Sequence, residues 1–110
     1  MAATKEDATL MVQLLSLGAQ MGFQEAMSHV MRDEFDPEQA GLDNTYVLTV
    51  LGMGETIGTF VKQGVLDRDL VTDLLWIDGM WSKVGPPALR AREHMGEKRL
   101  YENFEALATG

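Results

Sequence analysis

Residues 44–64, NTYVLTVLGMGETIGTFVKQG, are the most informative stretch of this sequence. The apolar side chains recur at helical spacing and do not show the strict alternation of a strand. Asp43 is suited to cap the N-terminus of a helix, and Gly64 is suited to end one. The pattern therefore predicts a long helix from about Asn44 to Gln63.

The apolar side chains of this helix cover about half of its surface when each residue is turned by about 100° around the axis. One side holds Val47, Leu51, Gly54, Gly58 and Val61, and the adjoining side holds Tyr46, Val50, Met53, Ile57 and Phe60. A surface helix of a monomer needs a narrower stripe, so we expect this helix to be central or to be covered on a second side by another subunit. Gly54 and Gly58 form a smooth patch where another helix can approach closely.

The next predicted helix covers about Arg68–Lys83. Asp67 can cap its N-terminus, and the sequence Gly85-Pro86-Pro87 would end it. Because the connection of residues 64–67 is short, we expect the two long helices to be antiparallel neighbours at the centre of the fold. The expected core face of the second one holds Leu70, Leu74, Ile77, Trp81 and Val84, flanked by Val71, Leu75, Trp76 and Met80.

Shorter amphipathic segments surround this pair. Thr4 can cap a first helix, with Asp7 in the capping-box position, and the expected inward stripe of that helix is Leu10, Leu14, Leu17 and Met21. Further helices are expected from Phe23 to near Asp36-Pro37, from Pro87 to His94 and over about Arg99 to Ala108. With 110 residues in all, the sequence predicts a single helical domain over 1–110, of the all-α class: a compact bundle of five or six helices.

The net charge of −8 arises from nine Lys and Arg residues against 17 Asp and Glu residues. Nucleic acids and anionic membranes require a basic face, so we expect neither as a partner. The chain has no cysteine, which excludes a disulfide framework, a thiol nucleophile and a Cys-ligated zinc site. No signal-peptide pattern and no apolar run of membrane-spanning length are visible, so we expect a soluble, cytoplasmic protein.

Two carboxylates, Glu55 and Asp78, stand out because apolar residues surround them in the sequence. A buried carboxylate is costly unless it is paired or hydrogen-bonded. We expect Glu55 to pair with a basic group, for which Arg90, Arg92 and Lys62 are candidates, or to cap a neighbouring helix. A paired-acid or metal site is the alternative, but the Glu-x-x-His pairs of helical-bundle metal sites do not occur. We therefore predict no metal site, no cofactor and no catalytic residue.

The C-terminal segment carries Leu100, Phe104 and Leu107 on one helical face. An isolated helix this short is unstable in water. We therefore expect it to dock, onto its own bundle or onto a second subunit, with Phe104 as the anchor. The alternative is a free peptide that folds only when it binds a partner.

The segment ETIGTFVKQGVLDRDLVTDLL, followed by a tryptophan-containing stretch and the YENFEALA end, resembles a family of small uncharacterised all-helical proteins found mainly in bacteria. The matching positions are Glu55, Gly58, Gly64, Leu66, Asp67, Tyr101, Asn103 and Phe104. The resemblance is good from Thr45 onward and looser before it, and LLWIDGMWSKV matches the family pattern only in part. It implies an all-helical fold and no particular activity.

Surplus apolar surface, eight methionines and the lack of a catalytic constellation favour a non-enzymatic protein-interaction or regulatory module that forms a homodimer. We expect the dimer to bury Tyr46, Met53 and Phe60, or Trp76 and Met80, or both sets.

The alternative function is a small-molecule-binding or enzymatic domain with a pocket lined by Trp76, Trp81, Glu55 and Asp78. A third interpretation, an adaptor for a basic protein, rests on the net charge. If Glu55 and Asp78 converge on an open cavity without a basic partner, the pocket is favoured. If each meets an arginine or the rim, the interaction module is favoured.

Overall fold

The computed structural model describes residues 2–110, and within that range it contains six helices and no strand. In chain order they are α1 (Lys5–Gln20), α2 (Phe23–Val30), α3 (Thr45–Lys62), α4 (Arg68–Leu74), α5 (Ile77–Met95) and α6 (Glu102–Thr109). The all-α prediction is confirmed, with six helices. None of the helices in the described range is long and apolar enough to cross a membrane.

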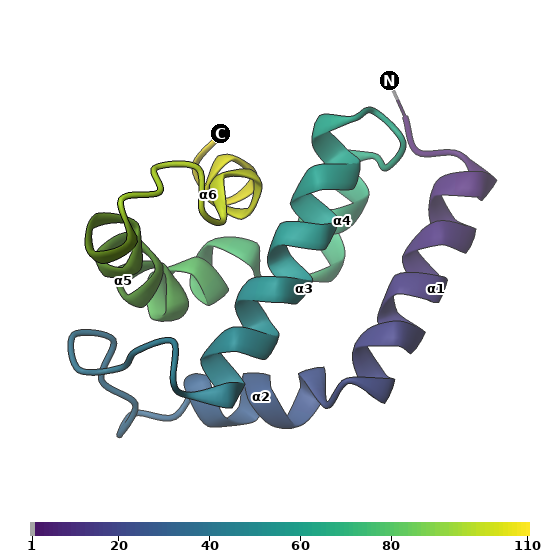
Figure 1. Ribbon diagram of the computed structural model, residues 1–110. Helices are drawn as coiled ribbons and strands as arrows, with labels where there is room; N and C mark the ends of the chain where they lie inside the picture. The colour runs from purple at the N-terminus through teal and green to yellow at the C-terminus, as the bar shows by residue number, and fades with distance from the viewer. Residues whose placement is uncertain (1) are drawn as a thin grey trace.

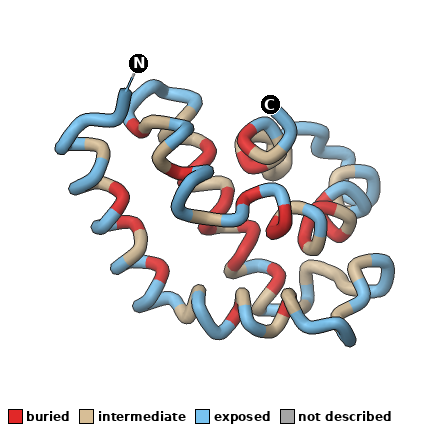
Figure 2. Tube along the Cα trace, turned by 180° about the vertical axis from the view of Figure 1, so that it is seen from behind, coloured by how far each residue is buried: buried red, intermediate tan, exposed pale blue. Residues whose placement is uncertain are grey.

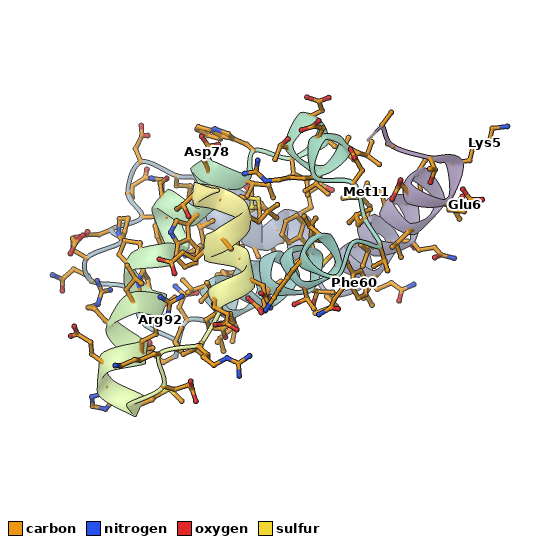
Figure 3. All side chains as sticks on the ribbon, turned by 90° about the horizontal axis from the view of Figure 1, so that it is seen from above. Lys5, Glu6, Met11, Phe60, Asp78 and Arg92 are labelled. Atoms are coloured by element: carbon orange, nitrogen blue, oxygen red, sulfur yellow. The ribbon has the colours of Figure 1, made fainter. Side chains whose placement is uncertain are left out.

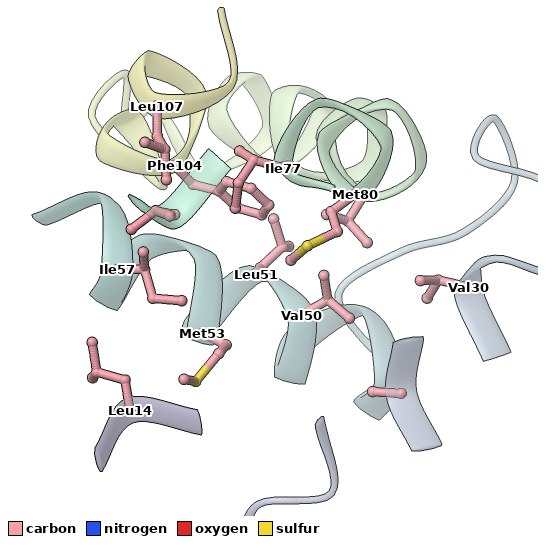
Figure 4. Close-up of a cluster of buried hydrophobic side chains, with 14 of the residues drawn as sticks. Leu14, Val30, Val50, Leu51, Met53, Ile57, Ile77, Met80, Phe104 and Leu107 are labelled. Atoms are coloured by element: carbon pink, nitrogen blue, oxygen red, sulfur yellow. The ribbon is translucent and has the colours of Figure 1, made fainter. Parts of the chain in front are cut away.

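Helix α3 runs through the middle of the fold, as predicted (Figure 1). It packs chiefly against α6 and α2, and less extensively against α5. In the core, Phe104 and Leu107 of α6 lie over one side of α3, and Leu14 of α1 lies near Met53 on another (Figure 4). The helix that follows α3 in sequence is therefore not its main partner. The buried apolar side chains of α3 are Val47, Val50, Leu51, Met53 and Ile57.

Asn44, and not Asp43, caps the N-terminus of α3. Its Oδ1 accepts hydrogen bonds from the backbone N–H groups of Tyr46 at 2.9 Å and Val47 at 3.3 Å. Both residue types are good caps, so the sequence located the start of this helix to within one residue.

The predicted helix over Arg68–Lys83 is wrong, because the chain breaks at Leu75 and Trp76. Leu75 is extended, with φ −122° and ψ 143°, and Trp76 is the N-cap of α5. Gly79 makes this turn possible, because a Cβ there would lie 2.2 Å from the Trp76 ring. Leu74 consequently points outward and is 52% exposed, whereas Val71 and Met80, predicted as flanks, are buried.

Helix α5 continues through Pro86 and Pro87, where the sequence predicted an end. A proline inside a helix lacks an N–H to donate and crowds the preceding turn. That cost is offset here by burial, since Val84, Pro87 and Ala88 all lie in the core. Tertiary packing has overridden a strong local preference.

Helix α1 lies along one side of the fold and is buried only along a narrow stripe (Figure 2). The buried positions are Met11, Leu14 and Gly18. The predicted stripe is therefore wrong in part, because Leu17 and Met21 are exposed. The helix is rotated so that its apolar arc extends beyond the core on both flanks.

Candidate functional site

The densest group of polar contacts in the structure surrounds Glu55, at the N-terminus of α6. Its Oε1 accepts hydrogen bonds from the backbone N–H groups of Asn103 and Phe104, both at 3.0 Å. Its Oε2 accepts one from Asn103 Nδ2 at 2.8 Å. Tyr101 occupies the N-cap position of α6, but its side chain makes no capping hydrogen bond. Glu55 thus caps α6 from another helix, where its charge also favours the positive end of the helix dipole.

Two glycines of α3 allow α6 to approach closely. A Cβ at Gly54 would lie 2.4 Å from the Phe104 ring, and a Cβ at Gly58 would lie 2.3 Å from the backbone oxygen of Asn103. The predicted close approach at this pair is confirmed. Phe104 is fully buried, and its ring meets Trp81 edge to face with centroids 5.1 Å apart. The predicted docking of the C-terminal segment is therefore confirmed, onto its own bundle and with Phe104 as the anchor.

Two arginines hold the rest of α6. Arg68 donates from Nη2 to the backbone oxygen of Leu107 at 2.9 Å, near the C-terminus of the helix. Arg92 donates from Nε to the backbone oxygen of Leu100 at 2.8 Å and from Nη1 to Glu105 at 2.9 Å. Carbonyl groups in the last turn of a helix have no partner within it, so a cation there is stabilising.

The Glu55 carboxylate also affects a neighbouring phenol. Burial, together with the charge of Glu55, raises the pKa of Tyr101 above its ordinary value of 10.0. The Tyr101 phenol therefore ionises only at a higher pH than an ordinary tyrosine.

The sequence left two alternatives for Glu55, an ion pair with a basic group or the cap of a neighbouring helix. The ion pairs found within residues 2–110 join Arg90 to Glu38, Arg92 to Glu105 and Arg99 to Glu102. Pairing of Glu55 with Lys62, Arg90 or Arg92 is therefore wrong, and capping of a neighbouring helix is confirmed. The contacts around Glu55 hold the fold together, because every one is made to α6 or within α3.

The four residues of the predicted pocket do not share a cavity. Asp78 lines a hollow of about 290 Å³ with Arg68 and Thr72, whereas Glu55 lines one of about 340 Å³ with Glu97 and Arg99. Trp81 packs on Phe104, and Trp76 is 68% exposed at the start of α5. Figure 3 shows Asp78 on α5, at a distance from the end of α3 that carries Phe60.

The residues predicted for a dimer interface divide into two groups. Met53 and Met80 are buried within the single chain, at 3% and 0% exposure, so their assignment to an interface is wrong. Tyr46 and Phe60 are half-buried, and Trp76 is exposed. The Tyr46 ring stacks on His29 with centroids 4.3 Å apart. The periodicity of α3 could not separate its core side from an interface side, because both are apolar.

A hollow of about 650 Å³ lies between residues 40–42 and the second half of α5. Its wall includes Pro87, Arg90 and His94. Arg90 closes one side by donating to the backbone oxygens of Pro37 and Ala40. In the described part of the chain, no three His, Asp or Glu side chains gather as a metal site would require.

Comparison with protein families gives a match over nearly the whole chain. The model of a domain of unknown function, DUF4760, matches residues 3–110. The chain belongs to this family. No curated protein and no solved structure matches it significantly. The resemblance inferred from the residues is thus confirmed, and it extends over the first helices as well.

The DUF4760 chain has two helices with exposed faces that lack charge, and the predictions missed them. Residues 8–24 contain no Asp, Glu, Lys, Arg or His, and residues 44–61 contain only Glu55. These two stretches supply most of α1 and α3. The exposed side chains of α1 after Asp7 are Ala8, Thr9, Val12, Gln13, Ser16, Leu17, Ala19 and Gln20.

The outward face of α3 in this DUF4760 chain is also uncharged. Its positions are Thr45, Leu48, Thr49, Gly52, Thr56 and Thr59, all exposed or half-buried. Three of the threonine hydroxyls donate to the backbone oxygen four residues earlier, which satisfies them within the helix. The charge-free stretches are visible in the sequence, and only the burial pattern shows that they are exposed.

Proposed function

We propose that this chain is a non-enzymatic protein-interaction or regulatory module that works as a homodimer in the cytoplasm. The observation that supports this most directly is the charge-free, partly exposed surface of α1 and α3. Surface helices normally carry charged or polar side chains on the face opposite the core. α1 carries no charge over residues 8–20, and an exposed helix face with apolar side chains and no charge is typical of a surface that meets another protein.

Net charge makes this surface the natural place for self-association. Two copies of a chain with a net charge of −8 repel each other wherever acidic faces meet. The charged residues lie mainly in residues 25–43 and 62–105, and residues 8–24 carry none. Two copies that meet through α1 therefore bring together the regions that repel least, while Val12, at 65% exposure, becomes buried.

A ligand-binding or catalytic role receives less support from the geometry. Of the four residues predicted to line one pocket, Asp78 and Glu55 line two different hollows, Trp76 is exposed, and Trp81 packs on Phe104. Glu55 already accepts hydrogen bonds from both of the first free N–H groups of α6. A carboxylate occupied in this way is poorly placed to act on a substrate.

The remaining features of the proposal rest on composition. An acidic chain is poorly suited to bind nucleic acid or an anionic membrane, since both require a basic face. A cysteine-free chain needs no oxidising compartment, which supports the cytoplasm as its location.

Light scattering coupled to size-exclusion chromatography tests the homodimer. We expect the mass to rise from 12.2 kDa toward twice that value as the concentration increases from micromolar to millimolar. Added salt should raise the dimer fraction, because it screens the repulsion between acidic chains and leaves apolar contacts intact. A mass of 12.2 kDa at every concentration would contradict the homodimer. Binding of a polylysine probe that salt abolishes would instead favour the adaptor for a basic protein.

A further inference from the structure

We infer that α1 pairs in antiparallel orientation with α1 of a second copy, along a seam formed by Ala8, Val12, Leu15 and Ala19. This inference rests on the proposed homodimer and specifies its contact surface. We call these four residues the α1 seam.

The α1 seam has the spacing of a helix-pairing surface. Its members follow each other at intervals of four, three and four residues. That is the spacing of the two contact positions in a heptad, which align on one side of a helix. The seam lies roughly a quarter-turn from the stripe of Met11, Leu14 and Gly18 that α1 buries in its own core. It is therefore a second apolar row on the same helix.

Most of the α1 seam is exposed, and only Leu15 packs in part against the core of its own chain. Val12 is 65% exposed, Ala8 and Ala19 are exposed, and Leu15 is half-buried. Next to its C-terminal end lies an apolar hollow of about 300 Å³, lined by Leu15, Ala19, Phe23, Gln24 and Met27. A partner helix along the seam would extend over this hollow with its first turn.

The side-chain sizes along the α1 seam are symmetric: Ala8 and Ala19 at the two ends are small, and Val12 and Leu15 in the middle are larger. If two copies pair around a two-fold axis between residues 13 and 14, Ala8 faces the partner's Ala19 and Val12 faces the partner's Leu15. Such an interface is isologous, so each contact occurs twice. Small residues meet at both ends, where the helices can come close, and the larger side chains fill the middle. This self-complementarity identifies the occupant as a second copy of the chain.

Charge agrees with this assignment. No charged residue lies between Asp7 and Glu25, so the paired helices place no carboxylates against each other along the seam. The antiparallel arrangement also brings the positive end of each helix dipole beside the negative end of the other.

The size of the surface predicts a weak dimer. α1 has 16 residues and is about 24 Å long. One helix seam is smaller than the roughly 800 Å² that each partner buries in a standard stable interface. We therefore expect self-association that depends on concentration.

Engineered cysteines test the pairing directly, because the natural chain has none. In the double variant Ala8→Cys/Ala19→Cys, the two sites lie 11 residues apart on one helix, about 16 Å along its axis. A disulfide requires Cα atoms within roughly 7 Å, so the two cysteines cannot bond within a chain. Mild oxidation of the double variant should give a covalent dimer. Ala8→Cys alone and Ala19→Cys alone should give little, since neither residue faces itself in an antiparallel pair.

A charge placed in the seam provides a second test. Val12→Glu brings carboxylates into the pair, and we expect its dissociation constant to rise by roughly tenfold or more. Gln13→Glu adds the same charge to the polar face one residue away and should leave the dimer unchanged. Both positions are exposed, so helical circular dichroism should show that both variants fold.

The outcomes separate this inference from the proposed function. A covalent dimer of the double cysteine variant, together with a dimer that only Val12→Glu weakens, supports the α1 seam. A dimer by light scattering that neither test affects overturns the seam and leaves the homodimer standing. Cross-linking of Ala8→Cys alone overturns the antiparallel orientation. A chain that is monomeric at every concentration overturns both.

Discussion

Helices α6 and α1 differ in how they are held, and the shorter one is held more firmly. α6 has eight residues, with Glu55 at its N-terminus, Arg68 near its C-terminus and Phe104 fully buried between them. α1 has 16 residues but buries only a narrow stripe of three. Its length makes it the better helix in isolation. Buried surface and satisfied helix ends decide how firmly each is fixed in the fold.

The difference indicates a division of roles within the chain. α6 completes the core, and its polar contacts all serve that purpose. α1 keeps apolar side chains in solvent on both flanks of its buried stripe. Regions with few buried contacts are those from which interaction surfaces are drawn. Substitutions in the two regions should therefore change different properties: stability for α6 and association for α1.

The largest expected effect is from removal of the α6 anchor. Phe104→Ala should lower the free energy of unfolding by about 3–5 kcal/mol, because the buried ring leaves a cavity. Urea denaturation followed by circular dichroism measures this value. Met21→Ala removes a large apolar side chain from the exposed flank of α1 and should cost far less. Equal costs at the two positions would show that the helices are held alike.

The next effect concerns the space between α3 and α6. Gly58→Ala places a Cβ 2.3 Å from the backbone oxygen of Asn103, which cannot move aside as a side chain does. We expect destabilisation toward the upper end of the roughly 1–3 kcal/mol typical of overpacking.

Gly52→Ala is the matched control for that substitution. It lies in the same helix, and a Cβ there meets nothing within 4 Å. Because alanine favours the helix, Gly52→Ala should stabilise the protein by about 0.5–1 kcal/mol. If Gly58→Ala destabilises the protein and Gly52→Ala stabilises it, then the contact with α6, and not helix propensity, determines the effect at position 58.

Several features of the contact between α6 and α3 could be predicted from the sequence. The Gly54–Gly58 spacing predicted a close helix approach, the apolar surroundings of Glu55 predicted a cap or a pair, and Phe104 predicted docking. Each depends on local chemistry that has few solutions. A carboxylate among apolar residues must find donors, and a short helix with a large aromatic must bury it.

The errors arose where tertiary packing chose between local alternatives. The Trp76 ring packs against Gly79, and the predicted helix is broken there. In contrast, α5 continues through Pro86 and Pro87, and the burial of Pro87 stabilises this arrangement. In α1 the apolar arc is wider than the part that is buried, so periodicity could not tell which stripe faces the core. The same ambiguity placed Met53 and Met80 at an interface when they lie in the core.

A smaller effect is expected from the cap of α6. Glu55→Gln should lower the free energy of unfolding by about 1–3 kcal/mol. The new amide N–H₂ would face the Asn103 amide N–H₂, which would then lose its hydrogen-bond acceptor. Glu55 is only half-buried, so we expect the lower part of that range. Glu93→Gln, on the exposed side of α5, removes the same charge and should be near neutral.

A second measurement on the same variant separates the cap from a general loss of packing. The charge of Glu55 helps to raise the pKa of Tyr101, so Glu55→Gln should lower that pKa toward its ordinary value of 10.0. Titration of tyrosine absorbance in the folded protein measures the shift. An unchanged tyrosine titration would contradict the placement of Glu55 beside Tyr101.

The smallest effect concerns the N-terminus of α1, where the sequence predicted a capping box. Asp7 Oδ2 accepts from the backbone N–H of Thr4 at 2.7 Å and from its hydroxyl at 2.9 Å, and Oδ1 accepts from the backbone N–H of Asp67 at 3.1 Å. The hydrogen bonds from Thr4 are the main cause that lowers the pKa of Asp7 below its ordinary value of 3.8. Because the folded state prefers the carboxylate, Asp7 stabilises the fold above that ordinary value, and its contribution disappears as the pH falls below it. Asp7→Asn should therefore lower the melting temperature near neutral pH, and the difference from the natural chain should close in acid.

Glu6→Gln removes the same charge one residue away and should leave a difference in melting temperature that varies less with pH. A difference for Asp7→Asn that stays constant into acid would show that the carboxylate does not anchor α1, and the contrast with α6 would then be larger than the structure indicates.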